Sequence, residues 1–137
     1  MYSQVVDIRT GTQETVHDLT GDCEEFLAGL PGRPEGLLHV FVPHATAGLA
    51  LIETGSGSDD DLLEVLEQVL PSGLGWRHRH GSPGHGRDHV LPAFLPPFAV
   101  LPVLAGRLEL GTWQRLCLVD TNRDNPLRKV RLSLIGG

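Results

Sequence analysis

Short runs in which apolar residues alternate with polar ones recur along nearly the whole chain. Alternation with a period of two places one row of side chains on each face of a strand, and turn residues separate the runs. The runs are SQVVDIRT, TVHDLT, GLLHVFVPH, GLALIET, FAVLPVLAG, RLELGTWQRLCLVD and RKVRLSLIG. This pattern predicts a β-rich α+β fold built from antiparallel strands.

Two segments carry helical spacing instead of alternation. The segment CEEFLAGL follows the cap candidates Thr20 and Asp22. A second helix is expected to begin at Ser58 or Asp59, because a stripe of leucines at helical spacing follows. A third short helix is expected after His89, where prolines limit its length. We therefore expect two or three short helices on one side of an antiparallel β-sandwich.

The length and charge of the chain limit its class and its partners. The 137 residues fit one domain over 1–137 with a core of its own. The net charge of −6 argues against nucleic acid as a partner. No signal peptide pattern occurs, and no window reaches the ~18 apolar residues of a membrane span, so we expect a cytoplasmic protein without a membrane partner. Cys23 and Cys117 have no CxxC spacing and are expected to be buried free thiols.

Several polar residues fall on the apolar rows of the expected strands. They are His44, Glu53, Thr112, Gln114 and Arg128. Each has an ordinary explanation when taken alone, such as a satisfied core histidine or a strand-end charge that reaches solvent. Together they would cost several kcal/mol if buried without partners, so they are expected to converge on one another, on water or on a ligand. A register shift of one residue would reverse any of these assignments.

Residues 76 to 89 read WRHRHGSPGHGRDH and contain four of the seven histidines. A polar, glycine-rich tract of this kind is ordinarily a solvated loop. Its ends can nevertheless approach each other, because the cost of closing a loop grows only slowly with its length. Inward-facing polar residues elsewhere need partners, and imidazoles can supply them. We expect the stretch to form one wall of a site.

A set of motifs occurs in a fixed order along the chain. They are HATAGLALIE, the acid at the head of a helix in DDDL, WRH, the DH before a short helix, LPV, GRLELGTWQ and NPLRKV. In this combination the chain resembles the YjbQ-like family, also called the secondary thiamine-phosphate synthase family, over nearly its whole length. The resemblance implies a small β-sandwich with helices, assembled as a homotrimer with histidine-lined pockets near the subunit boundaries.

The resemblance also assigns roles to individual positions. It marks His44, His78 and His89 as matched histidines, for which we expect metal ligation, and it leaves His80 and His85 as loop residues. The excursion between His78 and His89 is accordingly expected to be largely solvated. Departures from the family pattern, among them Ile52 in place of an asparagine, fall at the rim of the expected pocket, so a shared fold is a safer inference than a shared substrate.

Further positions complete the expected site. The resemblance places the family's aspartate at the head of the second helix on Asp61, if one residue is deleted before it. Either Asp61 or Glu53 could hold a metal, orient a histidine or take a proton. Both are therefore catalytic candidates. Four residues are expected to bind the substrate or its phosphate: Arg128, Gln114, Thr112 and Trp76.

The activity implied by the resemblance is a thiamine-phosphate synthase reaction. Hydroxymethylpyrimidine diphosphate would lose diphosphate, and the ring nitrogen of a thiazole phosphate would capture the pyrimidine. Such a reaction needs stabilisation of the leaving diphosphate, for which a divalent metal ion, zinc-like or Mg²⁺, is the expected cofactor. Protonated histidines and arginine could instead bind the anion directly. Two other functions stay open: a metal-dependent hydrolase of another phosphorylated metabolite, and a non-catalytic trimeric small-molecule binding module.

Overall fold

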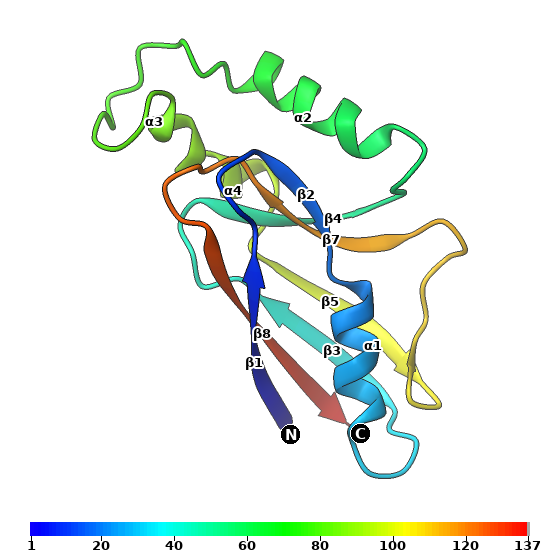
Figure 1. Ribbon diagram of the computed structural model, residues 1–137. Coiled ribbons are helices and arrows are strands. Elements are labelled where there is room, and N and C mark those ends of the chain that lie inside the picture. The colour runs from blue at the N-terminus through cyan, green and yellow to red at the C-terminus, as the bar shows by residue number, and fades with distance from the viewer. Residues whose placement is uncertain (137) are drawn as a thin grey trace.

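The computed structural model describes residues 1–136, which form two antiparallel sheets and four helices (Figure 1). The five-stranded sheet has the order β1-β8-β3-β5-β6, and the three-stranded sheet has the order β2-β7-β4. The strands are β1 (Tyr2–Arg9), β2 (Thr15–Asp18), β3 (Gly36–Phe41), β4 (Ala47–Ile52), β5 (Phe98–Leu104), β6 (Arg107–Leu108), β7 (Arg115–Asp120) and β8 (Leu127–Gly136). The predicted antiparallel, β-rich fold is confirmed.

The main core lies between the inner faces of the two sheets, and the alternation in the sequence produces it. In β3, Leu38 and Val40 are buried while their neighbour Leu37 is exposed. In β7, Leu116 and Leu118 face this core, and Val119 faces the other side of the small sheet. Burial of each such aliphatic side chain stabilises the fold by about 1.5–3 kcal/mol, so the register of both sheets is strongly specified.

Helix α1 (Thr20–Ala28) packs against the main core, and α2 (Ser58–Val69) lies on the outer side of the small sheet (Figure 1). Leu66 and Leu70 of this region bury a second, smaller core against Val119. Helix α2 begins at one of the two predicted positions and ends before Pro71. Two further helices, α3 (His85–Asp88) and α4 (Leu91–Phe94), complete the layer beside α2. The sequence predicted α4 but not α3.

The two cysteines are free and buried, as the sequence predicts. Burial raises the pKa of Cys23 to about 12 and that of Cys117 to about 12, so both thiols stay protonated and unreactive at neutral pH. Over residues 1–136, none of the helices combines the length and the apolar character required to cross a membrane.

Candidate metal centre

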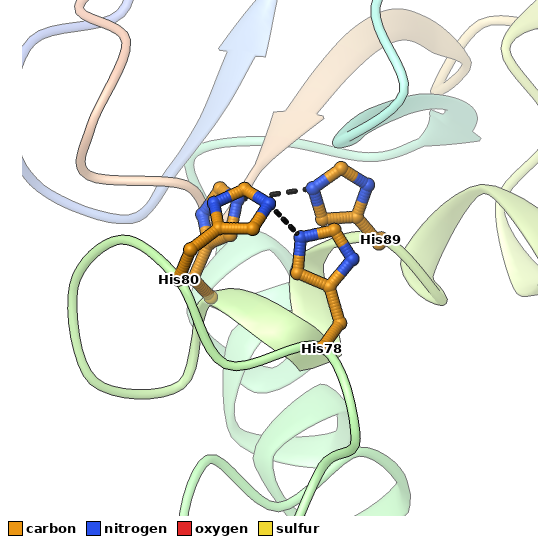
Figure 2. Close-up of side chains that lie close together, drawn as sticks. His78, His80 and His89 are labelled. Atoms are coloured by element: carbon orange, nitrogen blue, oxygen red, sulfur yellow. Dashed lines mark hydrogen bonds between the residues drawn. The ribbon is translucent and has the colours of Figure 1, made fainter.

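Four histidine side chains from the segment between α2 and α4 meet at one point, and Figure 2 shows the rings of His78, His80 and His89 turned toward one another. His78 Nε2 contacts His80 Nε2, and His89 Nε2 lies 3.0 Å from His85 Nε2. One ring nitrogen of each residue lies within 4.8 Å of those of the other three. In a tetrahedral zinc site the nitrogens lie about 3.3 Å apart, because each Zn–N bond is about 2.0–2.1 Å. The cluster therefore has nearly the dimensions of a metal site.

Glycines let the loop fold back on itself to form this cluster. Gly81 and Gly84 have a φ of 86°, in the left-handed region that residues with a Cβ rarely adopt. Gly86 packs directly against the segment that carries His78. A Cβ at position 86 would overlap the His78 carbonyl oxygen and lie 2.5 Å from Trp76 Cβ. A side chain at this position would push the two arms of the loop apart.

His85 is anchored on the protein side of the cluster. It is 8% exposed, and its Nδ1 lies 3.1 Å from Asp124 Oδ2 and 4.0 Å from Asp88 Oδ2, at angles that depart from those of a hydrogen bond. The Ser82 N–H donates to Asp124 Oδ2 over 3.0 Å and so fixes this carboxylate. A carboxylate behind one ring nitrogen orients the other nitrogen, as in many metal-bound histidines. His89 follows four residues later, on the same face of the helical turn.

The surroundings of His78 and His89 favour the neutral form of both imidazoles. Partial burial lowers the pKa of His89, and the neighbouring His78 and His85 lower it further. Partial burial also lowers the pKa of His78, together with His80 and His85. Only an unprotonated imidazole nitrogen can bind a metal, so these directions keep the nitrogens available as ligands at neutral pH.

The carboxylate of Asp88 lies beneath the cluster and is almost fully enclosed. Thr121 Oγ1 donates a hydrogen bond of 2.6 Å to Asp88 Oδ1. Burial raises the pKa of Asp88, and the Thr121 hydrogen bond opposes that rise. Asp88 and Asp124 together place acidic groups on the side of His85 that faces away from the other three rings.

A buried ion pair lies at the adjacent end of the sandwich. Arg128 is 1% exposed; its Nε donates to Asp120 Oδ2 over 2.7 Å, and its Nη2 donates to Asp120 Oδ1 over 2.9 Å. Arg128 Nη2 also donates to Thr46 Oγ1 over 2.8 Å. The prediction that Arg128 points inward is confirmed. Its partner was not predicted, although Asp120 continues the inward row of Leu116 and Leu118 by one further step.

Hydrogen bonds extend from this ion pair to the histidines. Asp120 Oδ1 accepts the Asn122 N–H over 2.9 Å, and Asn122 Nδ2 donates to Thr46 Oγ1 over 3.0 Å. Asn122 Oδ1 then accepts the Asp124 N–H over 2.8 Å. The network therefore fixes the turn after β7, and that turn holds Asp124 beside His85.

The comparisons with known proteins agree with this architecture. Residues 4–137 match the family model described as UPF0047 protein YjbQ-like. The chain belongs to the YjbQ-like UPF0047 family. A UPF0047 protein of Mycobacterium tuberculosis is 50% identical over 137 residues, which cover 100% of both chains. The UPF0047 protein YjbQ of Salmonella typhimurium is 30% identical over 121 residues, or 88% of each chain. The predicted family is confirmed.

Solved structures support the same fold for this YjbQ-like protein. A hypothetical protein from Aeropyrum pernix K1 superposes with a TM-score of 0.88 at 33% identity, and 100% of each chain is covered. A YbjQ-like protein of unknown function from Sulfolobus solfataricus gives a TM-score of 0.90 at 25% identity, with 99% of this chain and 97% of that chain covered. The β-rich fold with helices is thus a property of the family.

Within the YjbQ-like chain the histidines group differently from the sequence prediction. His78 and His89 come together as expected, with ring centroids 3.9 Å apart. His80 and His85 join them, so the expectation that these two lie apart from the site is wrong. His80 is an exposed loop residue as expected, whereas His85 is buried. The unpredicted α3 carries His85 inward. His44 is not in the group of four; it lies after β3, and its Nε2 accepts the Lys129 N–H of β8 over 2.8 Å.

The predicted acids lie outside the histidine cluster. Glu53 is half-buried directly after β4, and Asp61 is exposed in the first turn of α2. Asp60, the residue before it, lines a hollow of about 810 Å³ between α2 and the loop, and Asp61 does not. Partial burial and the charge of Arg128 lower the pKa of His44.

The other residues predicted to bind substrate occupy two places. Trp76 lines the hollow beside the histidines, and its Nε1 donates to the Pro71 carbonyl over 2.9 Å. Thr112 and Gln114 are exposed, so the prediction that they face the interior is wrong. Gln114 Oε1 accepts the Gly111 N–H over 2.8 Å and closes a turn just before β7. Asp120 is at the opposite end of this strand, about 20 Å away at the usual rise per residue.

Proposed function

We propose that the four-histidine cluster binds a divalent metal ion of the zinc type and that the protein uses this ion to bind a phosphorylated small molecule. The convergence of four ring nitrogens supports the proposal, because imidazole is a favoured ligand of zinc, whereas Mg²⁺ prefers oxygen. The carboxylate of Asp124 behind His85 has the position of an orienting group. The donor set therefore fits the proposed ion.

The activity that we propose is thiamine-phosphate synthesis, as the family resemblance implies. The bound ion would supply positive charge to the oxygens of the leaving diphosphate. A hollow of about 350 Å³ opens beside Trp76, His78, His80 and His85, where the indole offers an apolar wall for a flat ring. Arg79 lines the same hollow and brings a cation that can pair with phosphate.

An acidic hollow next to the histidines gives further support. It is the hollow of about 810 Å³, and it shares Ser72, Pro83 and Gly84 with the hollow at the cluster. Five carboxylates and two arginines line it, so negative charge is in excess; they are Glu14, Asp60, Glu64, Glu67, Asp88, Arg87 and Arg123. Thiamine phosphate carries a cationic thiazolium ring as well as a phosphate. A metal-bound phosphate with an acidic surface beside it suits a molecule with both charges.

We also propose that the protein is a cytoplasmic homotrimer. Six large apolar side chains that are 38–53% exposed lie on the outer face of the five-stranded sheet: Leu37, Phe41, Phe98, Val100, Leu104 and Ile135. They form one patch, since Phe41 pairs with Phe98 and Leu37 with Ile135 across the strands. Patches of this kind mark interaction surfaces, and we assign this one to the contact between subunits. Sedimentation of untagged protein tests the trimer, and a monomer at micromolar concentration would contradict it.

Incubation of the zinc-loaded protein with hydroxymethylpyrimidine diphosphate and thiazole phosphate tests the activity. We expect metal-dependent formation of thiamine phosphate and diphosphate, and loss of that product in the His85→Ala variant. Formation of the pyrimidine alcohol with no thiamine phosphate would indicate a hydrolase instead. Binding of the substrates without turnover would indicate a binding module.

A further inference from the structure

The four histidines of the cluster are not held equally. His85 is buried in α3 with two carboxylates behind it. His89 is half-buried at the end of the same helical turn. His78 is half-buried, and its backbone lies against Gly86. His80 is exposed on coil, and its side chain has one hydrogen-bond partner among residues 1–136, which is His78.

The backbone on both sides of His80 is fixed although its side chain is not. Arg79 Nε donates to the Trp76 carbonyl over 3.0 Å and holds the segment before it. A Cβ at position 81 would lie 2.7 Å from Asp124 Oδ2 and 2.9 Å from His85 Cγ, so Gly81 is packed closely against the cluster. Rotation of an exposed side chain on a fixed backbone takes only picoseconds to nanoseconds. His80 can therefore leave the cluster without unfolding the loop.

We propose that His80 is a displaceable fourth ligand: it completes the coordination of the metal in the resting protein and gives up its position to a phosphate oxygen of the substrate. This inference rests on the proposed metal site. Structural zinc sites are closed by four protein ligands, whereas catalytic sites have three and keep one position open. An ion closed by four histidines gains an open position when one ligand leaves, and His80 is the histidine held by the fewest interactions.

Cobalt-loaded protein titrated with inorganic phosphate provides the test, because the visible spectrum of Co²⁺ reports its ligands. In the wild type we expect a four-coordinate spectrum that changes when phosphate replaces the His80 nitrogen. The His80→Ala variant is expected to retain cobalt and to bind phosphate about tenfold more tightly, as it would if the open form made up about a tenth of the wild-type population. The His85→Ala variant is expected to lose cobalt affinity by more than ~100-fold, because even residues behind metal ligands contribute 10- to 100-fold.

The matched control is His17→Ala, because His17 lies on β2 outside the cluster. This variant should behave like the wild type. The His80→Gln variant and circular dichroism of each protein separate a change at the metal from a failure to fold. Loss of cobalt from His80→Ala as complete as from His85→Ala would overturn the inference, as would an unchanged phosphate affinity. A wild-type protein that binds neither cobalt nor zinc would overturn the proposed function as well.

Discussion

The buried ion pair and the histidine cluster are both polar centres, but their groups relate to each other in opposite ways. Arg128 and Asp120 have opposite charges, and Thr46 and Asn122 take part in the hydrogen bonds around them. The cluster brings together four groups of one kind, whose Nε2 atoms point at one another. A neutral imidazole has one donor and one acceptor, so these contacts pair the four nitrogens two by two and leave them no other partner in the cluster. The oppositely charged pair thus stabilises the fold, whereas four like groups that converge are suited to bind a ligand.

The largest effect is expected from breaking the ion pair. Arg128→Ala leaves the Asp120 carboxylate buried without its cation, so the free energy of unfolding should fall by about 3–5 kcal/mol. Urea denaturation followed by circular dichroism measures this loss. The control is Arg131→Ala, an exposed residue that donates to Ser3 Oγ, and it should cost less than about 1 kcal/mol. If both variants lost the same free energy of unfolding, the buried ion pair would have no special role in stability.

Removing one histidine should leave the metal-free fold largely intact. Zinc at a hundred times its dissociation constant is expected to add about 2.7 kcal/mol to the stability of the wild type, because it binds the folded state. His85→Ala should gain none of this, and His17→Ala should gain all of it. Thermal unfolding with and without zinc checks both. If zinc stabilised His85→Ala as much as the wild type, the zinc site would not be the histidine cluster.

A methyl group at Gly86 should separate the two arms of the loop. Gly86→Ala is expected to destabilise the protein by about 1–3 kcal/mol, because the Cβ overlaps the His78 carbonyl oxygen. It should also weaken zinc binding. Gly75→Ala is the matched control, since a Cβ there has no atom within 4 Å. Unfolding curves and zinc titrations of the two variants decide whether the close approach at position 86 forms the cluster.

The smallest expected change concerns the carboxylate behind His85. Asp124→Asn keeps the shape of the side chain and an oxygen for the Ser82 N–H, but it removes the charge beside the ring. Zinc affinity should fall about tenfold to a hundredfold. Competition with a coloured chelator measures it, with Asp7→Asn as the control at an exposed acid that pairs with Lys129. An unchanged affinity would mean that Asp124 does not orient His85.

The strand rows of the sequence predicted the ion-pair region better than the histidine cluster. A row on one face of a strand continues with a period of two, which places Arg128 inside and would have placed Asp120 there too. The row through Gln114 failed because the chain turns before β7. The cluster depends on a four-residue helix and on three glycines, and neither has a periodic signal. Asp124 reaches Ser82 across 42 positions of the sequence, so no local pattern could have predicted its role.

Metal content as a function of pH distinguishes a metal site from an anion site at the four histidines. Purified untagged protein at pH 8 is expected to hold about one zinc-type ion per subunit, and the occupancy should fall as the pH drops through ~6.5, because protons compete for imidazole nitrogens. Because the pKa values of His78 and His89 are lowered, these two histidines should keep the metal to a lower pH than ordinary histidines would. Protein without metal at pH 8, with phosphate binding that strengthens on acidification, would contradict the account and identify the cluster as an anion site.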